Sequence, residues 1–243
     1  MEGESHCSGS DLCEELAGTT RTSFSLTYGG DPPSRTIVDG GRLKLIADMS
    51  PLLLGHMLIV PAKHYLSFGH AAREIAADIQ HFLDFVLARY RSAFGASLIL
   101  EHGSSSDMTA AACITHAHWH LVPLDGVQVH RLIVEDGFSI QDLRSFADLE
   151  RYADADAAYF YSAFDDRHVV YVGDFTTRRQ YLRSTMARVL GIPDPLWDYA
   201  VAVRKDLLRE TMRLAGGWDS ETPFPRRVGQ SRNVINIGMD GER

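Results

Sequence analysis

Apolar residues recur along the chain with two different periods, and the shorter period predicts strands. Apolar and polar side chains alternate in short runs rich in β-branched and aromatic residues, as expected for strands with one buried face. Asp39-Gly40-Gly41 predicts a hairpin turn, because glycine accepts positive φ. The expected strands of the first half cover residues 22–28, 35–39, 42–48, 57–60, 97–101 and 116–123.

The longer period predicts one long amphipathic helix over residues 69–95. Its apolar side chains recur at intervals of three and four, at Ile75, Ile79, Phe82, Leu83, Val86 and Tyr90. Gly95 predicts its end. One helix among many short strands indicates an α+β fold, with a mainly antiparallel sheet and the long helix packed across it.

The pattern changes after residue 128. Helices are expected over residues 140–152, 177–190 and 195–215, and strands over 158–164 and 168–173. This suggests an N-terminal segment (1–21), a core domain (22–128), a smaller α/β or helical extension that forms or covers a pocket (129–216) and an irregular tail (217–243).

Composition narrows the range of functions. The 243 residues carry a net charge of −8, which argues against a broad nucleic-acid-binding surface. Three cysteines imply no disulfide framework, and the N-terminal residues lack the apolar stretch of a secretory signal. The apolar run over residues 51–61 is shorter than the ~20 residues that span a bilayer. We therefore expect a cytoplasmic protein without membrane contact.

Histidine is unusually concentrated: eight of the 11 histidines lie between residues 56 and 120. His116, His118 and His120 alternate along a predicted strand, so their rings should share one face, which we expect to be accessible to solvent. The outer two α-carbons would lie about 13 Å apart, so only neighbouring rings could share a metal ion. A neutral imidazole is a competent nucleophile at phosphorus. The alternatives are a zinc site using His116 and His118, or surface imidazoles.

Two motifs carry a family resemblance. His116-Ala117-His118-Trp119-His120-Leu121-Val122 resembles the His-φ-His-φ-His-φ-φ signature of the histidine-triad (HIT) superfamily of nucleotide hydrolases and transferases. Upstream, Asp48-Met49-Ser50-Pro51 and the Gly-His-Met-Leu-Ile-Val-Pro-Ala-Lys-His run at 55–64 are similar to a second HIT segment. The resemblance covers roughly residues 10–125 and implies a HIT-type sheet and a catalytic role for the core domain.

The resemblance also implies roles for individual residues. His118 would form a covalent nucleotidyl-histidine intermediate at an α-phosphate. His120 and His56 would contact the phosphate oxygens or the leaving group, and His116 would support the geometry of the strand. Asp48 would bind the ribose hydroxyls, the alternative being an aspartate that only forms the turn before Ser-Pro.

A loop of small residues is the candidate phosphate cradle. Gly103, Ser104 and Ser105 allow backbone N–H groups and hydroxyls to approach an anion, although the loop could equally be a connector. The sequence departs from the family just before the triad, where Ala111-Ala112-Cys113 replaces the usual Gly-Gln-Ser. The contact with the leaving group is therefore left open.

Some members of the superfamily bind a structural zinc, and the resemblance implies a matching set here. The ligands would be Cys7, Cys13, His64 and His116, a sound Cys₂His₂ set for tetrahedral zinc. The Cys-x₅-Cys spacing is wider than the usual Cys-x₂-Cys, and the alternative is two free thiols. No organic cofactor is expected.

The C-terminal half contributes a second group of candidate ligands. The segment from Thr176 to Arg183 resembles an extension found in a subset of bacterial HIT proteins. Arg178, Arg179 and Arg183 at a helix start could neutralise a polyphosphate or leaving group, with Gln180 beside them. The alternative is a solvated charged helix face.

The sequence as a whole favours a nucleotide hydrolase or phosphorolytic nucleotidyltransferase that acts through His118. The alternatives are a non-catalytic nucleotide sensor and a HIT frame adapted to a specialised biosynthetic substrate. The expected partner is a small-molecule nucleotide or nucleotide conjugate, and a second copy of the chain if it forms a homodimer.

Overall fold

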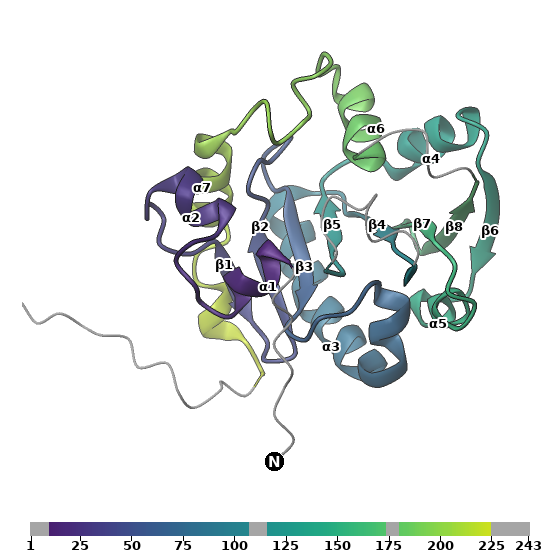
Figure 1. Ribbon diagram of the computed structural model, residues 1–243, viewed down its shortest axis with the longest axis horizontal. Helices are drawn as coiled ribbons and strands as arrows, with labels where there is room; N and C mark the ends of the chain where they lie inside the picture. The colour runs from purple at the N-terminus through teal and green to yellow at the C-terminus, as the bar shows by residue number, and fades with distance from the viewer. Residues whose placement is uncertain (1–9, 107–115, 174–179, 225–243) are drawn as a thin grey trace, which may run out of the picture.

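An eight-stranded antiparallel sheet lies at the centre of the molecule (Figure 1). The computed structural model describes residues 10–106, 116–173 and 180–224. The strand order is β1-β2-β3-β5-β4-β7-β8-β6. The strands are β1 (Thr36–Asp39), β2 (Leu43–Ala47), β3 (Met57–Pro61), β4 (Leu98–Gly103), β5 (Trp119–Val122), β6 (Ser139–Leu143), β7 (Tyr159–Phe164) and β8 (Arg167–Val172).

Helices surround this sheet, and one is much longer than the rest. They are α1 (Asp11–Leu16), α2 (Ser23–Tyr28), α3 (Phe68–Phe94), α4 (Gly126–Glu135), α5 (Glu150–Asp154), α6 (Tyr181–Leu190) and α7 (Lys205–Leu214), with short 3₁₀ turns η2 (Phe146–Leu149) and η3 (Trp218–Glu221). The α+β class, the antiparallel sheet, the long helix and further helices in the C-terminal part are therefore confirmed.

The long helix α3 forms because its sequence supplies both ends and one apolar face. The side chain of Ser67 accepts a hydrogen bond from the backbone N–H of His70 at the start. Gly95 ends the helix with a φ of 86°. The six apolar residues expected to face the core are all buried. They pack on the face of the sheet that carries Trp119 and Leu121.

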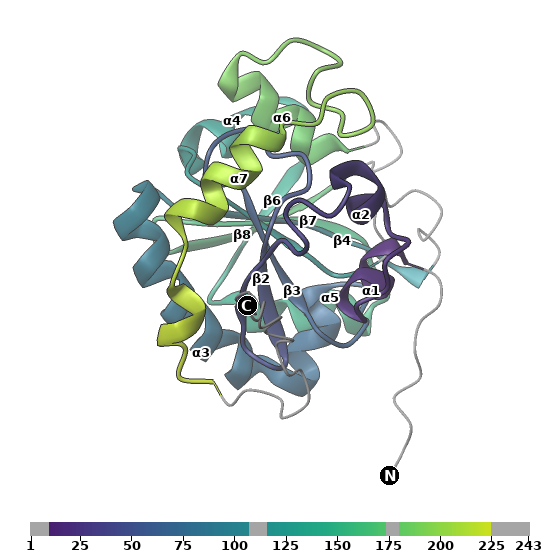
Figure 2. The same ribbon diagram turned by 90° about the vertical axis from the view of Figure 1, so that its left-hand side faces the viewer.

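The opposite face is covered at its two ends (Figures 1 and 2). At one end, α4 and α6 pack on β4, β5, β7 and β8 through a cluster that includes Leu100, Val122, Ile133 and Met186. At the other end, Leu12 of α1 packs on the outward side chains of β2 and β3. His118 and His120 lie between these two covers, so the fold leaves room for a pocket above them.

The prediction of a strand over residues 22–28 is wrong. Phe24, Leu26 and Tyr28 alternate as in a strand, but the segment is α2. Thr22 and Ser25 form a capping box, which satisfies backbone N–H groups at the start of the helix. Phe24 and Tyr28 lie four residues apart, so their rings stack on one helix face, while Leu26 is 76% exposed.

Other boundaries differ where tertiary pairing or local caps decide the structure. The helix expected over 140–152 is replaced at its start by β6, which pairs with β8, and only residues 150–154 form the α-helix α5. The helices expected over 177–190 and 195–215 are the shorter α6 and α7, and α4 was not expected. Asp125 explains α4, since its side chain accepts hydrogen bonds from the first backbone N–H groups of that helix.

The strand expected over 116–123 is shorter in the structure, because β5 begins at Trp119.

The sheet is continuous across the division expected at residue 128. Strand β4 pairs with β7 over five residue pairs, so strands from both halves belong to one sheet. The division into a core domain and an extension stays a prediction. A ligand above β5 would nevertheless lie close to elements from both halves of the chain.

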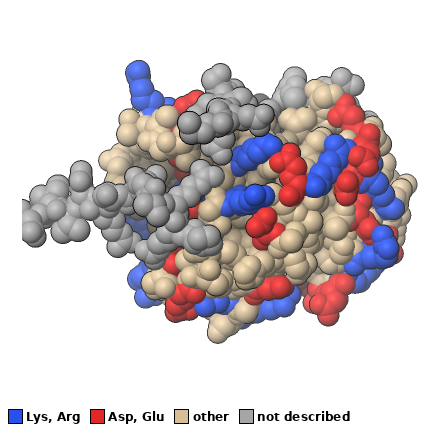
Figure 3. All heavy atoms as spheres, turned by 90° about the horizontal axis from the view of Figure 1, so that it is seen from below, with Lys and Arg blue, Asp and Glu red and all other residues tan. Residues whose placement is uncertain are grey.

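The molecular surface shown in Figure 3 mixes charges of both signs. Lysine and arginine side chains alternate there with aspartate and glutamate, so the described residues of this face form no broad basic area. Among the described helices, none is both long and apolar enough to cross a membrane.

Glu101 ties the start of α3 to three strands. Its buried carboxyl accepts hydrogen bonds from the Phe68 backbone N–H at 2.6 Å, and from Trp119 Nε1 and the Tyr159 hydroxyl at 3.0 Å each. Burial raises the pKa of Glu101 to about 7. The three donors would have no acceptor in this position if the carboxyl were removed.

We predict that Glu101→Ala lowers the unfolding free energy by about 3 kcal/mol or more, because it leaves three buried donors without an acceptor. Glu101→Gln keeps one acceptor oxygen and should lose clearly less. Urea denaturation of both variants and the wild type measures this. A loss below about 1 kcal/mol for Glu101→Ala would contradict the anchoring role.

Candidate active site

His118 presents one ring nitrogen to a cavity. Its Nδ1 lies 2.9 Å from the backbone carbonyl oxygen of His116. A carbonyl oxygen can only accept, so Nδ1 carries the proton and Nε2 of the neutral ring keeps its lone pair. Burial lowers the pKa of His118, which favours the neutral ring. The side chain therefore has the protonation pattern of a nucleophile or an acceptor.

His56 and His120 form a hydrogen-bonded pair beside it. The Leu52 backbone N–H donates to His56 Nδ1 at 3.2 Å, so the proton of His56 sits on Nε2. His56 Nε2 lies 2.9 Å from His120 Nδ1 and donates to it. The proton of neutral His120 is then on Nε2. Because His120 lines the cavity, this N–H is a donor available to a ligand.

Burial keeps this pair neutral. It lowers the pKa of His56 to about 4, although the charge of Asp48 acts in the opposite direction. Burial also lowers the pKa of His120 well below its usual range, and the nearby His118 and His56 add to this effect. Both rings are therefore uncharged at neutral pH.

Asp48 is engaged on several sides. Its Oδ1 accepts from the Ser50 backbone N–H at 2.8 Å, and its two oxygens lie 3.2 and 3.3 Å from Arg183 NH1. His56 Nε2 is 3.6 Å from Oδ2. Burial acts to raise the pKa of Asp48, but its neighbours, with the Arg183 guanidinium as its ion-pair partner, outweigh burial and hold the pKa well below its usual range. The carboxylate is charged, buried and occupied by groups of the chain itself.

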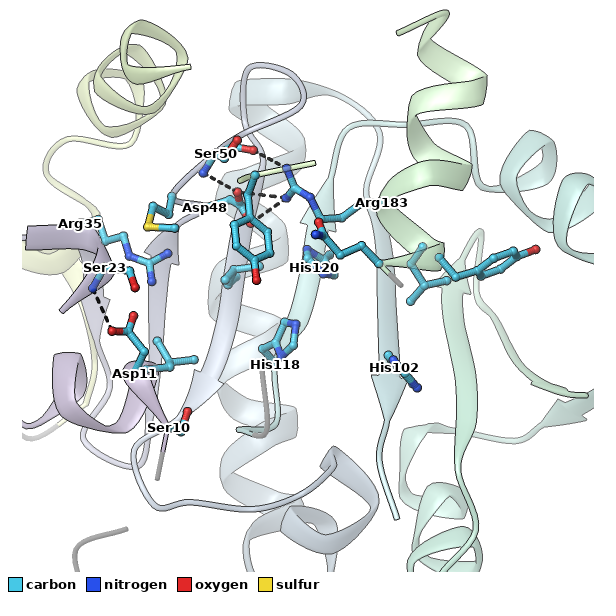
Figure 4. Close-up of a pocket in the computed structure, with 17 residues that line it drawn as sticks. Ser10, Asp11, Ser23, Arg35, Asp48, Ser50, His102, His118, His120 and Arg183 are labelled. Carbon is cyan, nitrogen blue, oxygen red and sulfur yellow. Dashed lines mark hydrogen bonds and ion pairs between the residues drawn. The ribbon is translucent and has the colours of Figure 1, made fainter. Parts of the chain in front are cut away.

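The cavity above these residues has a volume of about 300 Å³ (Figure 4). The N-terminal part of the chain contributes Ser10, Asp11 and Ser23 to its wall. Arg35 also lines it, but this guanidinium is held by Glu15 at 2.7 Å and by the Ala47 carbonyl oxygen at 2.9 Å. Its positive charge is therefore balanced within the chain.

The C-terminal part supplies the other wall, which includes Gln180, Arg183 and Tyr199. Gln180 Nε2 donates to Asp198 Oδ1 at 2.8 Å, which turns the amide oxygen to the opposite side. Within the described part of the chain this oxygen is buried and accepts no hydrogen bond.

Some of the expected ligand residues lie elsewhere. None of Gly103, Ser104 and Ser105 lines the cavity, and a Cβ on Gly103 would lie 2.2 Å from the Tyr159 ring. The packing of Tyr159 therefore explains this glycine, and the phosphate cradle stays a prediction. Arg178 and Arg179 lie outside the described residues.

His102 lines the cavity, although the sequence analysis assigned it no role. It follows Leu98 and Leu100 at alternate positions of β4, and Leu100 is opposite His120 in the neighbouring strand. Alternation combined with this register is the signal that could have found it. Burial, and then the proximity of His118, lower the pKa of His102 to about 4.

The three triad histidines do not share one accessible face as expected. His116 and His120 are buried, and His118 alone is partly exposed. His116 faces a second cluster, where its Nδ1 lies 3.1 Å from Cys13 Sγ. The expectation of an accessible row of imidazoles is wrong because α1 and the His56 turn cover its two ends.

Cys13, His64 and His116 could together hold a metal ion, since their ligand atoms lie within 4.8 Å of one another. Cys13 Sγ is 3.2 Å from His64 Nδ1. His116 Nε2 donates to the Pro61 carbonyl oxygen at 2.8 Å, which leaves its Nδ1 lone pair for a metal. Cys7, the fourth expected ligand, lies outside the described residues.

Comparisons with known proteins find solved structures that are similar to part of the chain. No family model matches the chain, and no curated protein matches it. A Hit-like protein involved in cell-cycle regulation from Bartonella henselae is similar at 18% identity and a TM-score of 0.33, over 44% of this chain and 81% of its own. A hypothetical histidine triad nucleotide-binding protein from Sulfolobus tokodaii is 23% identical with a TM-score of 0.33, over 43% of this chain and 69% of its own. More than half of the chain lies outside each match.

Proposed function

We propose that the chain is a nucleotide hydrolase or phosphorolytic nucleotidyltransferase that acts at an α-phosphate through His118. The observation that carries this proposal is the fixed tautomer of His118, with Nε2 unprotonated beside the N–H of His120. A nucleophile needs an unprotonated nitrogen such as His118 Nε2, and a phosphate oxygen needs a donor such as the His120 N–H. The HIT resemblance of both motifs supports the same assignment.

The proposed reaction has two displacements. His118 Nε2 attacks the α-phosphorus, a P–N bond forms, and the P–O bond to the leaving group breaks. The ring then carries a positive charge, which the His116 carbonyl oxygen stabilises through Nδ1–H. His120 Nε2–H donates to the phosphate oxygens as charge moves onto them. Water or inorganic phosphate then attacks phosphorus, the P–N bond breaks, the incoming group releases its proton to solvent, and neutral His118 is restored.

The roles of several other residues follow from this proposal. The cavity volume of about 300 Å³ is at the lower end of the usual range for small ligands, so it suits the nucleoside monophosphate part of a substrate. Gln180 is a proposed polar contact for a ligand, because the residue lines the cavity. We propose that residues 129–216 form one wall of this pocket, because Gln180, Arg183 and Tyr199 line it.

A nucleotide panel with product identification tests the activity. It should contain dinucleoside polyphosphates and other AMP- and UMP-bearing compounds, each with water or phosphate as the acceptor. We expect release of a nucleoside monophosphate with water, or a nucleoside diphosphate with phosphate. Tight binding without turnover would identify a sensor instead, and neither binding nor turnover would contradict a nucleotide function.

We also propose that Cys13, His64 and His116 hold a structural zinc ion, with Cys7 as the fourth ligand. The thiolate and imidazole donors suit zinc, and the hydrogen bond from His116 to Pro61 fixes the required tautomer. When bound, zinc would supply a cross-link between α1, the end of β3 and the residue that begins the triad. It would take no part in the reaction at phosphorus.

Metal analysis tests this second proposal. We expect about one zinc ion per chain in the wild type, and a large loss in Cys13→Ser. His81→Ala is the matched control, since His81 is an exposed histidine on α3 and should leave the zinc content unchanged. A wild type that stays free of zinc after refolding with the metal would contradict the proposal.

A further inference from the structure

The turn that carries Asp48 and His56 is held by the C-terminal part of the chain. This turn, residues 48–56, connects β2 to β3. The Ser50 hydroxyl donates to the Ala202 carbonyl oxygen, and the Gly55 backbone N–H donates to Thr211 Oγ1 of α7 at 2.9 Å. Segments about 150 residues further along the chain therefore fix both ends of the turn.

Arg183 makes the strongest of these contacts. Its side chain comes from α6, and the residue is only 5% exposed. NH1 binds both oxygens of Asp48, NH2 donates to the Ser50 carbonyl oxygen at 2.6 Å, and Nε donates to the Trp197 carbonyl oxygen at 3.2 Å. Each nitrogen of the guanidinium has a partner within the chain, and the charge lies against Asp48 (Figure 4).

This arrangement differs from the role expected from the sequence, in which Arg183 binds an anionic ligand and Asp48 binds a ribose. The two groups instead satisfy each other. They form the start of a buried series of contacts that runs from Arg183 to Asp48, from Asp48 to His56 and from His56 to His120. The series ends at the N–H that His120 presents to the cavity.

The charge of this series explains why an arginine is needed. A buried carboxylate without a cation is costly, and it would attract a proton onto a neighbouring imidazole. Among the described residues, the charged groups that act on His56 are Asp48 and Arg183, and Arg35 also acts on Asp48. His118 and His120 are the neutral titratable neighbours of His56. With Arg183 present, the carboxylate is balanced and the two imidazoles stay neutral.

We propose that Arg183 is a positioning residue of the active site: by balancing Asp48 and fixing the 48–56 turn, it keeps His56 and His120 neutral and aligned, with His120 Nε2–H directed to the ligand. The kinetic part of this inference rests on the proposed function, whereas the proton positions do not. The effects on His56 agree with it, since Asp48 raises the pKa of that ring and Arg183 lowers it.

The test is the titration of the two histidines in protein without ligand, followed by long-range ¹H–¹⁵N spectra of ¹⁵N-histidine-labelled samples. The peaks are assigned with His56→Ala and His120→Ala. In the wild type at pH 7 we expect both rings neutral, each with its proton on Nε2. In Arg183→Met we expect the midpoint of at least one ring to rise by about one pH unit or more.

Three further variants separate positioning from general damage. Asp48→Asn/Arg183→Met removes both charges and should return both rings to the neutral form. Arg183→Lys keeps the charge and provides a folded variant if Arg183→Met does not fold, with a smaller rise in the midpoint. Arg188→Met is the matched control, since Arg188 lies on the same helix and pairs with Asp136 away from the turn.

Kinetics provide the second readout. If turnover is found, Arg183→Met should lower kcat about tenfold or more with little change in KM, and the double variant should recover part of kcat. Unchanged titration midpoints in Arg183→Met, or a double variant whose rings are as charged as in the single variant, would overturn the inference. Absence of turnover in the wild type would reject the proposed function and leave the titration result to stand alone.

Discussion

His118→Ala is expected to lower kcat by at least about 10³-fold, because the variant lacks the atom that forms the bond to phosphorus. Folding should be little affected, since the ring is partly exposed and makes its one hydrogen bond within the described residues to a backbone carbonyl oxygen. Steady-state kinetics on the best substrate of the nucleotide panel measure the loss, and circular dichroism checks the fold.

His81→Ala is the control for this experiment, since it removes an exposed imidazole that does not line the described cavity and should keep full activity. A His118→Ala variant that retains activity near the wild-type level would reject the nucleophile assignment. Loss of activity together with loss of the folded circular dichroism spectrum would require the isosteric His118→Asn variant to decide the question.

The second large effect is a loss of stability in mild acid. Burial lowers the pKa of both His56 and His102 to about 4, whereas an unfolded chain has histidine pKa values near 6.5. The unfolded state therefore binds more protons between pH 6.5 and 4, and the unfolding free energy falls as pH falls through this range. Each group accounts for a loss on the order of 3 kcal/mol.

Glu101 acts in the opposite direction, because burial raises its pKa to about 7. Its folded form takes up a proton first, so it adds stability as pH falls from about 7 to 4.5. Because two histidines lower the free energy of unfolding and one carboxyl raises it, the free energy of unfolding falls on balance. Urea denaturation at pH 7.5, 6 and 5 measures it, and the same series on Cys13→Ser separates it from any loss of metal. A free energy of unfolding that is constant or rises toward pH 5 would contradict the prediction.

The sequence predicts best those features that depend on local pattern. The period of α3 and the glycine that ends it are local features, and the short runs of aromatic and β-branched residues that form β7 and β8 are equally clear. Residues 22–28 show the limit, because Phe24 and Tyr28 fit either a strand face or a helix face. The cap formed by Thr22 and Ser25 decides for the helix.

The site is predictable only where its residues lie in one motif. His118 and His120 follow from alternation along a single segment, and His56 from the upstream motif. The ion pair of Arg183 with Asp48 joins residues 135 positions apart, and no periodicity in either segment indicates that they meet. The ion pair depends on how α6 packs on the face of the sheet opposite to α3. Only the assembled fold defines that packing.

The covalent intermediate provides the most direct test of the central claim. The protein is mixed with a substrate of the panel, quenched within milliseconds in alkali, digested and examined by mass spectrometry. We predict a nucleoside monophosphate on the peptide that contains His118, at the ring nitrogen, stable in alkali and lost in acid. Turnover with no label on His118, or with the label on another residue, would contradict the account.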